Sequence, residues 1–116
     1  MTTKVMKFGG SSLATCERLR ASAKLVVEEA RKGTSIAVVV SAMGKTTEGL
    51  LGLACEVSCA RDRRELDQLL ASGEQQSAAL FSLALKDMGV PARSYTGAQA
   101  GIRVKGMSMD GRISSI

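Results

Sequence analysis

The stretch Lys4–Ser12, KVMKFGGSS, decides how the rest of the chain is expected to fold. Its apolar half suits a buried strand, and Gly9-Gly10 end that strand abruptly. Glycines let a backbone approach a ligand closely, and the two serines that follow add hydroxyls and free N–H groups before a helix begins. Because the unpaired N–H groups and the dipole of that helix point at the turn, the stretch predicts a site for an anion such as phosphate.

Lys7 lies just before the glycine turn and can add a full positive charge to this predicted site. The alternative is an ordinary turn between a strand and a helix, in which glycines are common. These nine residues do not decide between the two, so the choice rests on the remainder of the chain.

The residues after the turn predict a helix and a second strand. Thr15 is a suitable N-cap for a helix that runs to about Lys32, and Gly33 is a suitable C′ residue. The apolar stripe of this helix consists of Leu19, Ala23, Val26 and Ala30. The β-branched run Ser35–Ser41, SIAVVVS, lacks alternation and so predicts a central parallel strand covered on both faces. A strand, a helix and a strand with this spacing form a right-handed βαβ unit.

The second half of the chain predicts helices and then short strands. Ala42–Glu48 is a polar loop at the carboxyl end of the second strand, the edge at which open α/β sheets bind ligands. The expected helices are Leu50–Ala60, Leu66–Ser72 and Gln75–Met88, the last opened by Gly73-Glu74. The first should turn Leu50, Leu51, Ala54 and Val57 inward, and the last Ala78, Phe81, Leu85 and Met88. The expected short strands are Ala92–Thr96, Ile102–Val104 and Arg112–Ile116, with a turn at Gly97–Gly101.

Composition and charge are those of an ordinary globular chain. It has 116 residues, 45% hydrophobic and 23% charged, which is enough for one domain with a core. No apolar run approaches the ~20 residues of a membrane span, and the start lacks a secretory signal, so a cytoplasmic protein without a membrane partner is expected. The net charge is +5, but the basic residues are scattered among carboxylates. Aromatic residues make up only 3% of the chain, so a nucleic-acid partner is not expected.

Several catalytic and metal-binding arrangements are excluded or weakly indicated. The chain has no histidine, which removes Ser-His-Asp and Cys-His nucleophilic groups and most zinc sites. Cys55 and Cys59 lie one helical turn apart, where small core residues are commoner than metal ligands. Gly44-Lys45-Thr46 resembles the end of a P-loop, but Val39 stands where that motif needs glycine, so a P-loop NTPase is not expected.

What remains is a group of polar residues that follow the two parallel strands. The first strand is followed by Gly9, Gly10 and Ser11, with Lys7 beside them, and the second by Ser41 and Thr47. If the strands are neighbours, both loops lie at one sheet edge, which suits a phosphate held beside a polar substrate. Glu74 has two interpretations, a first-turn carboxylate favoured by the helix dipole or an acceptor for a substrate ammonium.

Three motifs in this order closely resemble the aspartate kinases of the amino acid kinase superfamily. They are KFGGSS, VVVSAMGKTTEGLL and LLASGEQQSAALFSLALKDMGVPARSYTGAQAGI, and the resemblance runs from about Val5 to Ile116. It implies a three-layer αβα, open and mainly parallel sheet, incomplete here. It also implies transfer of the ATP γ-phosphoryl group to the β-carboxylate of L-aspartate, which leads towards lysine, threonine and methionine.

The resemblance also implies roles for individual residues. The positions that match those for phosphate and ATP are Lys7, Gly9, Gly10 and Ser11, with Lys7 neutralising the transferred group. The positions that match those for aspartate are Ser41, Thr47 and Glu74, with Glu74 receiving the amino group. Mg²⁺ would accompany ATP, and no residue is assigned to hold a metal. Phosphoryl transfer depends on alignment and charge neutralisation, so the missing histidine is no obstacle.

The departures from the family concern length. Residues 1–116 match the N-terminal portion of the catalytic domain, while the later glycine- and serine-rich segment for ATP and the regulatory ACT domains are absent. The isolated chain is therefore expected to have weak or no kinase activity and to form a homo-oligomer or pair with a complementary chain. Two alternatives remain: a superfamily member acting on glutamate, a nucleotide or carbamate, and a non-catalytic module that binds an acidic metabolite or a partner chain.

Overall fold

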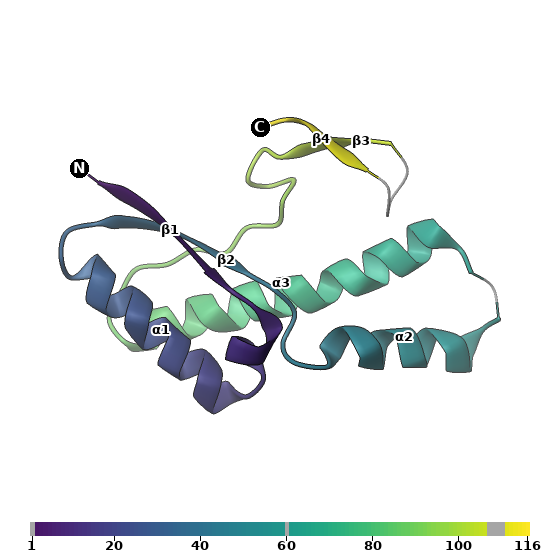
Figure 1. Ribbon diagram of the computed structural model, residues 1–116, viewed down its shortest axis with the longest axis horizontal. Coiled ribbons are helices and arrows are strands. Elements are labelled where there is room, and N and C mark those ends of the chain that lie inside the picture. Colours follow the sequence, from purple (N-terminus) through teal and green to yellow (C-terminus); the bar gives the residue numbers. More distant parts are fainter. Residues whose placement is uncertain (1, 60, 107–110) are drawn as a thin grey trace.

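The computed structural model describes residues 2–59, 61–106 and 111–116, and its first half is a strand–helix–strand unit (Figure 1). Strand β1 (Thr3–Phe8) leads through a short 3₁₀ helix, η1 (Gly10–Leu13), into helix α1 (Cys16–Ala30), and strand β2 (Ser35–Val40) follows. The two strands pair in parallel, from Thr3 opposite Ser35 to Phe8 opposite Val40. The predicted parallel βαβ arrangement is therefore confirmed.

Helix α1 begins and ends through the groups that the sequence indicated. The Oγ1 atom of Thr15 accepts a hydrogen bond of 3.1 Å from the backbone N–H of Arg18, which caps the first turn. The helix ends at Ala30, and Gly33 takes a φ of +83°, the left-handed conformation that suits glycine after a helix.

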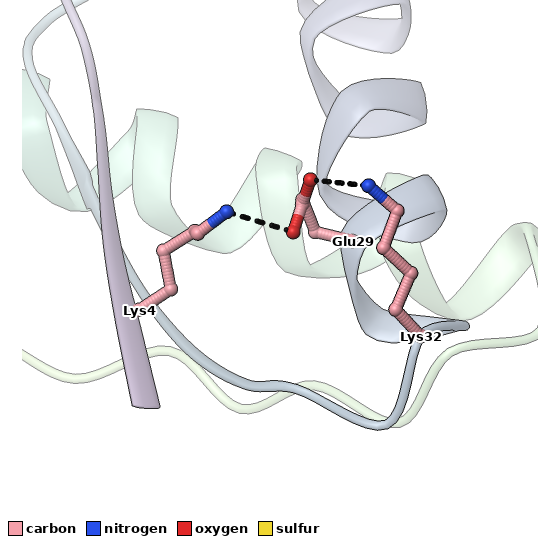
Figure 2. Close-up of polar contacts among 3 residues, drawn as sticks. All are labelled: Lys4, Glu29 and Lys32. Atoms are coloured by element: carbon pink, nitrogen blue, oxygen red, sulfur yellow. Dashed lines mark hydrogen bonds and ion pairs between the residues drawn. The ribbon is translucent and has the colours of Figure 1, made fainter. Parts of the chain in front are cut away.

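An ion-pair cluster of three residues joins the end of α1 to the start of β1 (Figure 2). Glu29 accepts hydrogen bonds of 2.9 Å from the Nζ atoms of Lys32 and Lys4, one on each carboxylate oxygen. The bond from Lys32, with the smaller contribution of Lys4, lowers the pKa of Glu29 below its ordinary value. The same bond from the other side raises the pKa of Lys32.

Helices α1 and α3 (Arg63–Asp87) pack on the same face of the β1–β2 sheet. The core that they form consists of Leu13, Leu19, Ala23, Val26, Val27, Phe81, Ala84 and Leu85. The sheet adds Met6, Phe8, Ile36, Val38 and Val40 to it, and the rings of Phe8 and Phe81 lie 5.4 Å apart. This core confirms the predicted apolar stripes of both helices in most of their positions.

The opposite face of the sheet is open in the described part of the chain. Val5 is 67% exposed and Val39 is 48% exposed, because alternate residues of a strand point to opposite faces. The prediction that the second strand is covered on both faces is therefore wrong for the described residues. The α/β class with a parallel sheet is confirmed, and the described residues hold one helical layer of it.

Helix α2 (Thr46–Val57) packs less closely than the sequence indicated, and it starts inside the range predicted as a loop. None of its residues is buried, and Leu51 and Val57, expected to face inward, are 40% and 85% exposed. Leu50 and Ala54 are half-buried. The helix packs on α3 and not on the sheet, so only the side that faces α3 is partly buried.

Helix α3 is one continuous helix where two were predicted. Asp62 caps it by accepting hydrogen bonds from the backbone N–H groups of Arg64 and Glu65, so the charged stretch forms its first turns. The predicted break at Gly73-Glu74 is wrong, because both residues lie in the helix interior. Gly89, with a φ of +85°, follows its end as predicted.

The chain then crosses to an antiparallel hairpin that lies away from the three α-helices in Figure 1. The hairpin pairs β3 (Arg103–Lys105) with β4 (Arg112–Ser115), close to the predicted short strands. The predicted strand Ala92–Thr96 is wrong: no strand forms there. The predicted turn at Gly97–Gly101 is confirmed, and Thr96 and Gln99 exchange hydrogen bonds of 2.9 and 3.1 Å across it.

Candidate functional site

The loops that follow β1 and β2 meet at the carboxyl edge of the sheet. The N–H of Ser41 donates to the carbonyl of Phe8 at 3.2 Å, which extends the ladder between the two strands. Beyond it, the N–H of Gly44 donates to the carbonyl of Gly10 at 3.0 Å. The expected meeting of the two loops is therefore observed, and a direct backbone hydrogen bond holds them together.

Two glycines allow this close approach. A Cβ atom at Gly10 would lie 3.1 Å from the carbonyl oxygen of Ala42, which is closer than carbon and oxygen normally come. Gly44 has a φ of +48°, and a Cβ there would lie 3.3 Å from the Cα of Ala14. Gly9 differs, because it is extended and the space beside its Cα is open. Gly10 and Gly44 thus serve the contact between loops, whereas Gly9 leaves free space at the turn.

The glycine turn leads into η1 and not straight into the long helix. Helix α1 starts at Cys16, and Thr15 already caps its first turn, so the helix-dipole argument made from the sequence does not apply to the glycines. Instead, α1 holds η1 from the side. The guanidinium of Arg18 donates a hydrogen bond of 3.1 Å to the backbone carbonyl of Ser11. The hydroxyl of Ser22 donates a hydrogen bond of 3.1 Å to the backbone carbonyl of Ser12. Sequence analysis missed both contacts, since nothing in the spacing marks them.

Lys7 lies on the open face of the sheet, opposite Val39 in the register of β1 and β2. Its ammonium forms no hydrogen bond or ion pair with any described residue. Alternation along β2 carries Ser41 to the same side as Val39, and therefore to the side of Lys7. The open face of the sheet, rather than the helix-covered face, is thus where the lysine and the serine can act on one ligand.

The neighbours of Thr47 and Glu74 in the sequence lie in the contact between α2 and α3. A Cβ at Gly73 would lie 3.3 Å from Cγ2 of Thr46 and 3.4 Å from Cβ of Ala42, so α3 passes directly against the first turn of α2. Thr46 fixes that turn, because its hydroxyl donates to the carbonyl of Met43 at 2.6 Å. Glu74 and Thr47 each directly follow a residue of this contact.

The position of Glu74 excludes one of its two interpretations. It lies in the middle of α3, so the helix dipole does not explain it as a first-turn carboxylate; Glu65 has that place. It is exposed and forms no ion pair with the described residues. Its charge is therefore available to a ligand. Sequence analysis missed the packing of Gly73, although a glycine inside a strongly helical pattern is a signal for close packing.

Among the described residues, neither metal-ligand clusters nor membrane-spanning helices give a further site. Within this part of the chain, no group of three or more His, Cys, Asp or Glu side chains could hold a metal ion. The three cysteines are free and exposed, so the interpretation of Cys55 and Cys59 as core residues is wrong. Among the described helices, none has the length and apolarity that crossing a membrane would require.

Comparisons with known proteins agree on one family. The sequence profile described as the amino acid kinase family matches residues 2–116. The aspartokinase of Mycolicibacterium smegmatis is 46% identical over 116 residues, which is 100% of this chain and 28% of the relative. The aspartokinase of Geobacillus stearothermophilus is 47% identical over 112 residues, which is 97% of this chain and 28% of the relative. This chain thus spans about 28% of the length of these curated relatives.

A solved structure is similar in fold as well as in sequence. The crystal structure of aspartate kinase from Synechocystis matches with a TM-score of 0.75 and 48% identity. The match covers 79% of this chain and 16% of that one.

Proposed function

Because the chain belongs to the amino acid kinase family, we propose that it is the part of an aspartate kinase that aligns a phosphoryl donor with L-aspartate. The complete reaction moves the γ-phosphoryl group of ATP to the β-carboxylate and gives aspartyl phosphate. The observation that carries the proposal is the 3.0 Å hydrogen bond from Gly44 to Gly10. It joins a glycine turn suited to phosphate to a polar loop suited to a small substrate.

The phosphate side of the proposed site comes from the β1 loop. Lys7 supplies the positive charge that neutralises the transferred group, and the turn of Gly9, Gly10 and Ser11 supplies backbone N–H groups and a hydroxyl. The open space at Gly9 supports this role, because a phosphate must approach the backbone there closely. Such a site catalyses by alignment and charge neutralisation, which needs no covalent group from the protein.

The aspartate side of the proposed site comes from the loop after β2, the first turn of α2 and α3. Ser41 and Thr47 supply hydroxyls for a carboxylate, and Glu74 supplies a negative charge for the α-ammonium. Support comes from the contact at Gly73, which holds α3 against the first turn of α2. An acceptor with both an ammonium and carboxylates fits this donor set better than carbamate or a nucleotide does.

ATP and Mg²⁺ are proposed as the phosphoryl donor and its metal. The ammonium of Lys7 and the amides of the glycine turn have the chemistry that phosphate oxygens need. Mg²⁺ commonly binds through substrate phosphates with few protein carboxylates, so it would arrive with the nucleotide. When bound, the metal would neutralise charge on the phosphate oxygens.

The wider role follows from the same proposal. Residues 1–116 would be the N-terminal portion of the catalytic domain, in a cytoplasmic enzyme on the route to lysine, threonine and methionine. The open sheet face, with Val5 and Val39 exposed, supports a homo-oligomer or a complementary chain.

Separate titrations of L-aspartate and of ATP with Mg²⁺ into this chain, followed by calorimetry, test the proposal. Lys7→Gln should weaken binding of the phosphate ligand about tenfold or more, since a hydrogen bond to a charged group is worth about 1.5–3 kcal/mol. It should leave aspartate binding nearly unchanged, while Glu74→Gln should do the reverse. Lys24→Gln, an exposed lysine of α1, is the matched control and should change neither.

Turnover is measured by trapping aspartyl phosphate with hydroxylamine, and this chain alone should give little. Aspartate binding without ATP binding would favour the non-catalytic module. Binding of neither ligand, or equal loss of both in Lys7→Gln with an unchanged circular dichroism spectrum, would reject the proposed site.

A further inference from the structure

Two thiols, one in the last turns of α2 and one just beyond its end, line a single hollow. The hollow lies between the end of α2 and the start of α3 and has a volume of about 280 Å³. Its lining residues are Leu51, Ala54, Cys55, Ser58, Cys59, Arg61 and Leu66. We propose that Cys55 and Cys59 act together as a dithiol site that chelates a thiophilic metalloid, trivalent arsenic in an organoarsenical.

The two thiols reach the hollow from different backbone conformations, Cys55 from inside α2 and Cys59 from beyond its end. The helix ends at Val57, and Ser58 is extended, with φ −160° and ψ 149°, so Cys59 leaves the helical path. Both thiols nevertheless open on the same hollow, and one atom bonded to both sulfurs spans a wider gap than a sulfur–sulfur bond.

The walls of the hollow select the kind of ligand. Leu51, Ala54 and Leu66 are apolar and suit an organic substituent, and no carboxylate is among the lining residues. Arg61 adds a fixed positive charge, which opposes a divalent cation. No third ligand joins the cysteines in the described residues, as a tetrahedral metal ion would require. A trivalent metalloid that carries one organic group and two thiolates is neutral and needs only the two.

Phenylarsine oxide is the probe, and its reaction is balanced without any oxidant. Two S–As bonds form, the two S–H bonds and the As–O bonding break, and the oxygen leaves as water with both thiol protons. Arsenic stays trivalent. Both cysteines are exposed, so the reagent can reach them.

Intact-mass spectrometry of the reduced chain should show one phenylarsenic group per monomer. Subsequent alkylation should then label Cys16 alone, the exposed cysteine that lines a different surface hollow. Cys55→Ser and Cys59→Ser should each weaken retention of the probe by about 100-fold or more, because the second bond then loses its high effective concentration. Cys16→Ser, the matched control, should retain the probe as the parent does.

Three results would overturn the dithiol site. The first is that Cys55→Ser or Cys59→Ser retains the probe as strongly as the parent chain does. The second is that the probe protects Cys16 and one other cysteine from alkylation. The third is an intact mass that corresponds to two chains bound to one arsenic atom. The alkylation map is read on the parent chain, so it stands even if a variant folds poorly.

Discussion

Replacing Gly73 with alanine tests the contact that places Glu74. The new methyl carbon would lie 3.3 Å from Cγ2 of Thr46, 3.4 Å from Cβ of Ala42 and 3.5 Å from Cδ1 of Leu50. Favourable carbon contacts lie at about 3.5–4.0 Å, so the Thr46 methyl group must move by a few tenths of an ångström. The substitution therefore strains the packing of α3 against the first turn of α2.

The expected change in stability is the balance of two terms. Alanine is better than glycine in a helix interior by about 1 kcal/mol. An extra methyl in a filled space costs about 1–3 kcal/mol. The net result should be a loss of about 0–2 kcal/mol in the free energy of unfolding. Gly52→Ala is the matched control, because Gly52 also lies inside a helix but has open space beside its Cα, so it should gain about 0.5–1 kcal/mol.

Urea denaturation followed by circular dichroism measures both variants, and aspartate titration measures the site. If Glu74 binds the α-ammonium, Gly73→Ala should weaken aspartate binding more than binding of the phosphate ligand, while Gly52→Ala should change neither. A Gly73→Ala variant as stabilised as Gly52→Ala would refute the argument, since it would mean that α2 and α3 accommodate the methyl group without strain.

Three further predictions concern the elements around the site. Gly44→Ala should lose about 1–2 kcal/mol of stability in urea denaturation because φ is +48°, whereas Gly9→Ala, in open space, should lose almost none. Thr15→Ala should lose about 1 kcal/mol with its cap, and no loss would reject the cap. Because folding lowers the pKa of Glu29, its carboxylate stabilises the folded chain at pH values above the pKa of this group in the unfolded chain. This stabilisation is lost as the pH falls through the pKa of the group in the folded chain. Glu29→Gln should therefore flatten the fall of the melting temperature from neutral pH to about pH 4, while Glu28→Gln, the neighbouring carboxylate, should keep the parent's profile.

The local part of the fold could be predicted because its signals lie close together in sequence. A β-branched run, a threonine before a helix and a glycine after it each act within a few residues, and they gave β2 and both ends of α1 correctly. The pairing of β1 with β2 then follows from the handedness and spacing of the unit. The residues between Phe8 and Ser41 therefore carry most of what sequence alone establishes.

The errors arise where a distant contact outweighs a local preference. Glycine at position 73 predicted a helix break, but the helix continues through it, and the missing side chain lets α3 pack closely on α2. The run of valines predicted burial on both faces, yet α1, which precedes it, and α3, which follows it, pack on the same face. Residues 92–96 have the composition of a strand, but no described strand forms a ladder with them.

In the candidate site too, local sequence signals and distant contacts each decide part of the outcome, and Glu74 is the clearest example. The sequence alone allowed a carboxylate at this position to be an acceptor for a substrate ammonium. It equally allowed the carboxylate a routine role in the first turn of a helix. Only the continuity of α3 separates the two, because it removes the helix terminus that the routine role requires. An exposed carboxylate that caps nothing and pairs with none of the described residues contributes little to stability. The contact at Gly73 holds α3 against the first turn of α2, which carries Thr47, and a ligand with a positive group is the partner that we propose for Glu74.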